Sequence, residues 1–383
     1  MPATKSSILD TLSLRDLIKY LDDLISEKQQ YELSDIQFTP GNVPYVRGFK
    51  PISDDDTNDV NIVRCEPNLF YPINLRHPVT DEETRELITD IIESELYLKL
   101  LEQNRQISIT RSIGHSFYRI TAYYQRNKLS VSVRHLKSKV PTPSELNIPK
   151  EAVAKASLEL PSGLIIVSGP TGAGKTTTAM SLLAEKIKMS NGSPHVVTIE
   201  EPVEYRLDSD FNGAIVEQRE IPEDTPNWEM AMKNVIRENP NIIYVGEVVD
   251  AETALNCIRI ASNGHLVITT FHSPTIEETM SRFMSFLNRS DKLLFANALN
   301  SVFNQDLRNF GGQIFPLIQA VSIDNSIRKV MIDEKWEEMK TYFTSSNSFT
   351  RKDSLKWINE QLMRIQMPAD MLIRKKRKNS DEY

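Results

Sequence analysis

The chain has 383 residues, 40% of them hydrophobic and 25% charged, which is an ordinary globular composition and enough length for two domains. Its formal net charge of −7 argues against a general nucleic-acid coat protein, which would be basic. The two cysteines, Cys65 and Cys257, match no metal-ligand spacing and favour a reducing environment. No apolar run approaches the ~18–20 residues that span a bilayer, and the first residues lack the apolar core of a signal peptide. We therefore expect a cytoplasmic protein that meets a membrane only peripherally or through partners.

The first 139 residues predict an N-terminal α+β domain. Ser13 followed by Asp16 is typical of a helix N-cap with an acidic first turn, and Thr80 with Glu83 forms a capping-box pattern. Apolar residues repeat at helical spacing after each cap, at Leu14, Leu17, Ile18, Leu21, Leu24 and Ile25, and at Leu87, Ile88, Ile91, Ile92 and Leu96. Strand-like patterns lie at 36–38, 43–46, 107–110, 116–124 and 130–135. We interpret the acidic stretch Ser53–Asp59 as a solvated loop.

A second domain follows a short linker. The two prolines of Val140–Ser144 favour an extended chain, so we place the linker at 140–150 and the second domain at 151–310. Apolar strands at 164–167, 196–199, 242–245 and 266–270 alternate with helical patterns, which is typical of a mainly parallel α/β sheet. Residues 311–383 are interpreted as a helical region with a polar tail. The basic run Arg374–Lys378 is either a solvated tail or an electrostatic contact with anionic lipid or nucleic acid.

One loop of the second domain fits the phosphate-loop pattern of glycine, four residues, then Gly-Lys-Thr. Its residues are Gly169, Pro170, Thr171, Gly172, Ala173, Gly174, Lys175 and Thr176, with Thr177 opening the predicted helix behind them. In such a strand–loop–helix turn, backbone N–H groups and the helix N-terminus bind phosphates. Lys175 would reach the β- and γ-phosphates, and the Thr176 hydroxyl would ligate Mg²⁺. A glycine-rich turn that only joins strand to helix is the alternative, but the flanking strand and helix favour nucleoside-triphosphate binding.

Carboxylates follow two of the predicted parallel strands. Glu247 comes directly after the strand at 242–245, and ligands of open parallel sheets bind at the carboxyl ends of strands. We therefore expect Glu247 beside the Mg²⁺ held by Thr176. Glu200 and Glu204 follow the strand at 196–199, and either is a candidate for the base or water-orienting group. For each glutamate the alternative is a surface or capping carboxylate.

Two histidines bracket the strand at 266–270. His265 precedes it and His272 follows it, and no neighbouring ligand completes a metal site. The histidines are candidates for contacting the γ-phosphate, with an ordinary structural role as the alternative.

These motifs occur in an order that resembles the secretion and pilus ATPase superfamily. The phosphate loop comes first, followed by the acidic box Thr198–Tyr205, the pair Gly246-Glu247 and the histidine box Gly264–His272. Upstream, the likeness extends to Leu33–Phe38, Pro44–Arg47, Tyr118–Ile120, Tyr124–Asn127 and Val133-Arg134. The superfamily includes retraction motors of the PilT kind, DotB-like ATPases of type IVB secretion, and ATPases of conjugative transfer. Val249 stands where the family often has an arginine.

The resemblance implies a fold, cofactors and roles for individual residues. It implies a PAS-like N-terminal domain, a RecA-like P-loop ATPase core and a homohexameric ring in which each ATP, with Mg²⁺, lies between a C-terminal and an N-terminal domain. By position, Glu204 matches the catalytic glutamate, and Glu247 matches the metal-side glutamate. His265 and His272 match the histidine box. The candidates for charge-neutralising arginines are Arg119, Arg126 and Arg134.

The leading hypothesis is a hexameric ATPase that powers a type IV secretion, conjugative-transfer or type IV pilus machine. It would work at the cytoplasmic side of the inner membrane through membrane-bound partners, with nucleic acid not expected as a direct ligand. The absence of a four-cysteine cluster from the sequence argues against pilus-assembly and type II secretion ATPases, many of which carry one. Departures from the family pattern, such as Val249 in place of an arginine, argue against a plain retraction motor, so we favour the type IVB secretion or conjugative-transfer branch. Two alternatives stay open: a DNA translocase or helicase on the same core, and an ATP-gated structural ring with little turnover.

Overall fold

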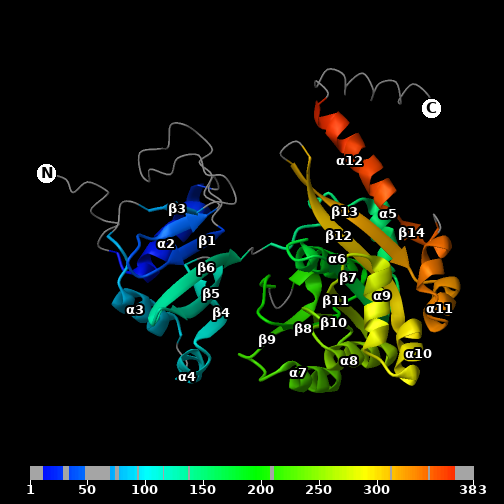
Figure 1. Cartoon of the computed structure of the whole chain (residues 1–383), viewed down its shortest axis with the longest axis horizontal. Coiled ribbons are helices and arrows are strands. Elements are labelled where there is room, and N and C mark those ends of the chain that lie inside the picture. Colours follow the sequence, from blue (N-terminus) through cyan, green and yellow to red (C-terminus); the bar gives the residue numbers. More distant parts are fainter. Residues whose placement is uncertain are drawn as a thin grey trace. The chain divides into compact units, whose positions relative to one another are not determined.

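A computed structural model describes residues 12–28, 34–47, 70–73, 77–92, 95–114, 116–136, 139–207, 211–310, 313–343 and 346–366. The chain divides into two compact units (Figure 1). The N-terminal unit comprises Met1–Lys139 together with Pro202–Arg206, and the C-terminal unit comprises Val140–Glu201 together with Leu207–Tyr383. The domain boundaries drawn from the sequence stay a prediction. The acidic stretch Ser53–Asp59 and the basic run Arg374–Lys378 lie outside the described residues.

The N-terminal unit is an antiparallel sheet of six strands in the order β3-β2-β1-β6-β5-β4. Its strands are β1 (Asp35–Phe38), β2 (Tyr45–Arg47), β3 (Phe70–Pro72), β4 (Gln106–Ile113), β5 (Ser116–Gln125) and β6 (Lys128–Leu136), and its helices are α2 (Leu14–Lys28), α3 (Asp81–Ile91) and α4 (Glu95–Asn104). Apolar side chains of the helices share one core with alternate residues of the strands. The opposite face of the sheet therefore carries the polar alternates, among them Asp35, Arg119 and Arg134.

The N-cap patterns in the sequence correctly predicted the starts of helices α2 and α3. The Thr80 side chain accepts a hydrogen bond from the backbone of Glu83, and the Glu83 carboxylate accepts one from the backbone of Thr80, so the predicted capping box is confirmed. The Ser13 hydroxyl accepts from the backbone N–H of Asp16 at 3.1 Å. The predicted apolar stripe of α3 is buried at Leu87, Ile88, Ile91 and Ile92.

The C-terminal unit is an eight-stranded sheet in the order β14-β13-β12-β7-β11-β10-β8-β9. Its strands are β7 (Gly163–Gly169), β8 (His195–Glu200), β9 (Ile215–Glu220), β10 (Ile242–Val245), β11 (Leu266–His272), β12 (Leu299–Phe310), β13 (Gln313–Ser322) and β14 (Ser348–Phe349). The strands from β12 through β9 pair in parallel, whereas β13 and β14 are antiparallel. The predicted fold class, with its mainly parallel sheet, is confirmed.

Helices enclose this sheet. They are α5 (Lys150–Val153), α6 (Lys175–Met189), α7 (Trp228–Val235), α8 (Ala251–Ser262), α9 (Ile276–Ser285), α10 (Arg289–Ala298), α11 (Asn325–Ile332) and α12 (Arg351–Gln366), with 3-10 turns at Ala154–Ala156, Phe211–Gly213, Ile236–Glu238 and Trp336–Tyr342. Helices α7 to α11 share one apolar core with the central strands, while α6 packs against β7 and β11 outside that core. All seven residues of β7 are buried, as expected of a central strand covered on both faces.

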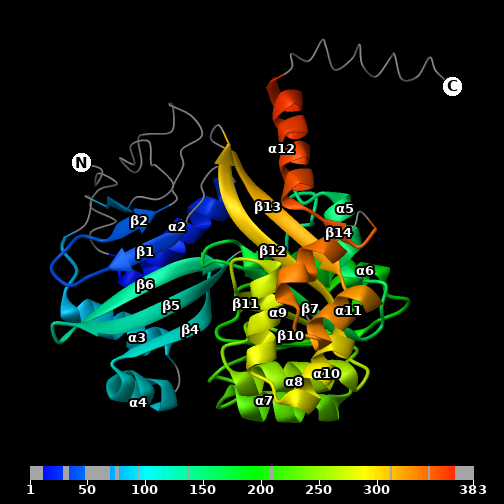
Figure 2. The same cartoon turned by 45° about the vertical axis from the view of Figure 1, so that its right-hand side comes forward.

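The segment after Phe310 contains strands as well as helices. Strand β13 pairs along its own whole length with Ser301–Phe310 of β12. Figure 2 shows the two as a long hairpin with α12 near β13. Phe315 and Leu317 of β13 pack against Ile358 of α12. The prediction of a helical region missed β13 and β14, although Gly311-Gly312 between two apolar runs is a hairpin signal in the sequence.

Candidate nucleotide site

The carboxyl ends of the parallel strands form one edge of the C-terminal sheet, and the predicted nucleotide motifs lie along it. Gly169 at the end of β7 and His272 at the end of β11 are register partners. Glu200 ends β8, and Gly246-Glu247 directly follows β10. Because open parallel sheets bind ligands at this edge, the topology gathers these motifs where a ligand is expected.

The loop between β7 and α6 has the backbone that phosphate binding requires. Gly172 and Gly174 have φ angles of 75° and 77°, a left-handed conformation that glycine adopts without strain. Gly174 is the N-cap of α6, and Lys175 is its first residue. The N–H groups in the first turn of a helix have no intrahelical partner and favour anions. The predicted nucleotide-binding residues Gly169, Pro170, Thr171, Gly172, Ala173, Gly174, Lys175, Thr176 and Thr177 all lie in this loop and the first turn of α6.

Three of the predicted site residues contact one another in a chain. The Lys175 ammonium lies 3.2 Å from Nδ1 of His272 and donates to the carbonyl of Pro170 at 3.1 Å. The same ammonium lies 3.5 Å from Nε2 of His272, so it contacts both ring nitrogens. Nε2 of His272 also lies 2.9 Å from the Glu247 carboxylate. The structure therefore brings Lys175, His272 and Glu247 together, and the roles expected of them stay predictions.

Glu200 is placed differently from the other candidate glutamates. Only 2% of it is exposed, and one carboxylate oxygen accepts from the Thr198 hydroxyl at 2.8 Å and from the Gln218 amide at 3.1 Å. The oxygen of the same Gln218 amide accepts from the backbone of Leu207 at 2.7 Å. Gln218 of β9 thus links Glu200 in the acidic box to Leu207, two residues after the box, which favours a positioning role for Glu200. Sequence reasoning missed Gln218, which no motif marks.

His265 is not brought to the phosphate loop. It precedes β11, and its Nδ1 lies 2.7 Å from the carbonyl of Pro240. The strand Leu266–His272 separates it from the loop edge, and at about 3.3 Å per residue the two histidines are roughly 20 Å apart. The structure therefore favours the structural alternative for His265.

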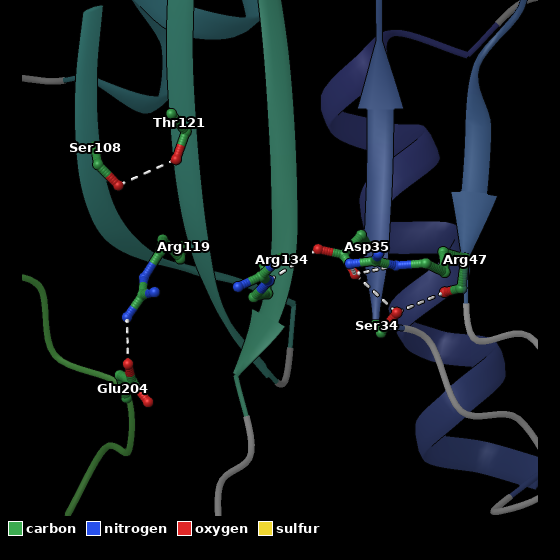
Figure 3. Close-up of polar contacts among 8 residues, drawn as sticks. All are labelled: Ser34, Asp35, Arg47, Ser108, Arg119, Thr121, Arg134 and Glu204. Carbon is green, nitrogen blue, oxygen red and sulfur yellow. Dashed lines mark hydrogen bonds and ion pairs between the residues drawn. The ribbon is translucent and has the colours of Figure 1, made fainter. Parts of the chain in front are cut away.

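The three predicted arginines lie in the N-terminal unit, where strand register sets Arg119 and Arg134 in a row with Asp35 and Arg47. Asp35 of β1 pairs with Arg47 of β2 and with Arg134 of β6, and Arg134 pairs with Arg119 of β5. Figure 3 shows these side chains together on the sheet. Nε of Arg134 donates to one oxygen of Asp35 at 2.8 Å, and Arg47 donates to the other oxygen. Burial alone would raise the pKa of the Asp35 carboxyl, but the hydrogen bonds from Arg134, Arg47 and Ser34 outweigh it and lower that pKa.

Arg119 faces the acidic box instead of Asp35. One terminal nitrogen of its guanidinium lies 3.6 Å from the Glu204 carboxylate, as Figure 3 shows, and both residues belong to the N-terminal unit. Nε and Nη2 of Arg119 are buried and make no hydrogen bond to any residue that the structure describes. A buried guanidinium without hydrogen bonds is costly, so Arg119 is poised for a further anionic partner. Arg134, by contrast, is already bound by Asp35.

Arg126 lies apart from this row. It occupies the turn between β5 and β6, with a φ of 50°, at the end of the hairpin away from Arg119. The candidate residues thus fall into two groups. Lys175, Glu247 and His272 lie in the C-terminal unit, whereas Arg119, Arg134 and Glu204 lie in the N-terminal unit.

The mainly parallel sheet, with this strand–loop–helix turn and a carboxylate after β10, has the architecture of a RecA-like ATPase domain. A family model described as "Type II/IV secretion system protein" matches residues 124–314. This match supports membership of the secretion and pilus ATPase superfamily.

Individual relatives support this membership. The type IV pilus retraction ATPase PilT of Pseudomonas aeruginosa is 28% identical over 332 residues, which cover 84% of this chain and 89% of that protein. The type IV pilus ATPase PilU of the same organism is 32% identical over 209 residues, covering 55% of this chain and only 53% of PilU. A crystal structure of the retraction motor PilT with bound ADP matches with a TM-score of 0.70 and 26% identity, covering 90% of this chain and 97% of that one.

No helix among the described residues is long and apolar enough to cross a membrane. No group of three or more histidine, cysteine, aspartate or glutamate side chains lies together there as a ready-made metal site.

Proposed function

We propose that the protein is a Mg²⁺-dependent ATP hydrolase that works as a homohexameric ring and powers a pilus or secretion machine. The contact chain from Lys175 through His272 to Glu247, at the mouth of the phosphate loop, is the observation that carries this proposal. The family description and the names of the relatives supply the class of machine.

The residues present fit a nucleoside triphosphate with Mg²⁺. The left-handed glycines and the start of α6 would hold the phosphates, and Lys175 would balance the charge of the β- and γ-phosphates. The Thr176 hydroxyl and the Glu247 carboxylate are hard oxygen ligands of the kind that Mg²⁺ prefers. A bound Mg²⁺ would supply charge neutralisation at the phosphates. His272 contacts both Glu247 and Lys175, so it is placed to respond to a ligand that draws Lys175 away.

The N-terminal unit supplies the remaining groups of the proposed mechanism. Glu204 is proposed to orient the attacking water and accept its proton, and Arg119 to balance charge that develops on the transferred phosphoryl group. The contact between them supports a shared role, and the unsatisfied nitrogens of Arg119 favour it over Arg134. We propose that these residues serve a nucleotide bound by another subunit of the ring, as the family resemblance implies.

The location and partners follow from the class of machine. We propose that the ring works at the cytoplasmic side of the inner membrane, attached through membrane-bound components of the pilus or secretion machine. The preference for the secretion or conjugation branch, drawn from the sequence, stays a prediction. Nucleic acid is not proposed as a direct ligand.

The test is Mg²⁺-dependent ATP hydrolysis per subunit as a function of protein concentration. We expect the specific rate to rise steeply and then level off, because the active site is completed between subunits. Lys175→Ala should lower the plateau by at least about 10³-fold, because it removes the cation at the phosphates. Circular dichroism checks that this variant is folded. Normal turnover by folded Lys175→Ala protein would contradict the phosphate-loop assignment.

A further inference from the structure

Strand β12 forms the wall behind the phosphate loop. It pairs in parallel with β7, so that Asn304 is the register partner of Ser168 and Gln305 lies beside the start of the loop. Gln305 is 1% exposed, and its side-chain Nε2 donates a short hydrogen bond to the carbonyl of Ala173 in the loop. The sequence motifs do not mark Gln305, because it lies more than a hundred residues after the loop.

Gln305 also touches both ends of the loop. A Cβ atom built on Gly169 would lie 2.3 Å from the backbone oxygen of Gln305, which is too close for any side chain. A Cβ on Gly174 would lie 3.2 Å from Nε2 of the same residue. The first and last glycines of the loop are therefore packed against one residue of β12, and the bond to Ala173 lies between them.

The bond to Ala173 fixes the direction of a whole peptide group. In a planar trans peptide the C=O and N–H point in opposite directions. When Gln305 holds the carbonyl of Ala173 toward β12, the N–H of Gly174 points away from β12. Loop N–H groups are the donors that bind phosphates in this motif. Because Gln305 holds the Ala173 carbonyl on the β12 side, the Gly174 N–H points toward the side where the phosphates bind.

Stability alone does not account for a glutamine at this position. The amide must present its nitrogen to Ala173, because the flipped orientation would set two oxygens against each other. Oε1 of Gln305 is then buried with no hydrogen-bond partner among the residues that the structure describes. Burying an unpaired amide oxygen destabilises a protein, whereas an apolar side chain of the same shape would avoid that cost.

We propose that Gln305 is a positioning residue of the nucleotide site, which holds the Ala173–Gly174 peptide in the orientation that binds phosphate. This inference rests on the proposed function, since it requires that the loop binds a nucleotide. Gln305 does not touch the ligand; it acts through the loop. It follows that loss of the amide should weaken nucleotide binding without weakening the fold.

The test compares Gln305→Met with the wild-type protein by calorimetric titration with ADP and by thermal unfolding with and without ADP. Methionine matches glutamine in length but cannot donate to Ala173. We expect the Kd for ADP to rise about tenfold. The unfolding temperature of the ligand-free variant should be unchanged or higher, because the unpaired oxygen is gone. Gln319→Met is the matched control in neighbouring β13 and should leave the Kd unchanged.

Each other result has a definite meaning. A ligand-free variant that unfolds at a lower temperature but binds ADP as tightly as the wild type would show a purely structural role and overturn the inference. If Gln305→Met does not fold, Gln305→Glu replaces it. In Gln305→Glu, the carboxylate opposes both Ala173 and the phosphates and should raise the Kd more than tenfold, and an unchanged Kd overturns the inference. Wild-type protein that does not bind ADP would overturn the proposed function, and with it the inference.

Discussion

The candidate residues form two sets, one in each unit, and each set, called a half below, is built by a different rule. In the C-terminal unit, Lys175, His272 and Glu247 follow the ends of parallel strands, so short contiguous motifs place them. In the N-terminal unit, strand register brings Asp35 to Arg134, although the two are 99 positions apart in the sequence. One half therefore depends on local loop geometry and the other on long-range pairing. Under the proposed function, nucleotide binding depends on the C-terminal residues alone, whereas turnover requires residues of both units. Substitutions should therefore separate binding from turnover.

Within the N-terminal unit, the arginines differ in how far their charges are satisfied. Arg134 and Arg47 share the buried carboxylate of Asp35, which is a closed arrangement. Arg119 has one ion pair to Glu204 and buried nitrogens that make no hydrogen bond within the described residues. Because unsatisfied buried donors are costly, they mark positions where a ligand or partner completes the structure. Within the N-terminal row, Arg119 is the member best suited to act on a phosphate.

The largest effect is expected at Arg119. Arg119→Ala should lower ATP hydrolysis by about 10³-fold or more, since a charge-neutralising arginine contributes that much in phosphoryl transfer. Its ADP affinity should stay unchanged, because the phosphate loop is intact. Arg134→Ala should cost less activity, because Arg134 is already bound by Asp35. Steady-state hydrolysis and ADP titration measure both quantities.

Two further measurements decide what the Arg119 result means. Arg105→Ala removes an exposed arginine that stacks on Tyr124 and should leave turnover unchanged. Mixing Arg119→Ala with Lys175→Ala protein should restore part of the activity, if each arginine serves a nucleotide on another subunit. No recovery at any mixing ratio would count against a site shared between subunits.

The sequence predicted the motif-built half better than the register-built half. The loop from Gly169 to Thr176 is contiguous, and Glu247 follows an apolar strand whose parallel neighbours were recognisable, so both were predicted. The contacts of Gln218 and Gln305 were not predicted, because their partners are far away in the sequence and become neighbours only through the order of the strands. For the same reason, roles for Arg119 and Glu204 were proposed from the family resemblance, whereas their contact was not predicted.

The fold shows the same division. The capping box of Thr80 and the four central parallel strands were readable from local patterns. Strands β13 and β14 were missed, because β13 is identified by its pairing with β12 and β14 is only two residues long.

A smaller loss of ATP turnover is expected from a substitution at Glu247, which lies in the C-terminal unit and should leave the N-terminal unit unchanged. Glu247→Gln should lower ATP hydrolysis by about 10²-fold, because it removes a metal-side carboxylate and weakens the hold on His272. ATP binding should persist, since Lys175 and the loop remain. Rapid-mix hydrolysis and equilibrium ATP titration separate the two steps. Glu252→Gln, in the first turn of α8, is the matched control. Unimpaired hydrolysis in Glu247→Gln would remove Glu247 from the site.

The smallest effect is a change in stability at Asp35. Asp35→Asn should destabilise the N-terminal unit by about 2 kcal/mol, because Arg134 and Arg47 lose their shared buried carboxylate. The loss should depend on pH with a definite sign. The folded-state pKa of Asp35 is lowered, so its stabilisation is fully present above its ordinary pKa of 3.8 and disappears as the pH falls through the lowered value.

Urea unfolding of wild type and Asp35→Asn between about pH 7 and pH 3, followed by hydrogen exchange in β1 and β6, tests that sign. The difference in unfolding free energy should be constant near neutrality and shrink below pH 3.8. Asp90→Asn, at an exposed position of α3, should show no such difference. A gap between wild type and Asp35→Asn that widened on acidification would mean that Asp35 is stabilised in its protonated form. The ionised Asp35 carboxylate would then not be what holds Arg134 and Arg47 in place. The comparison between the two units would in that case depend only on Arg119 and Glu204.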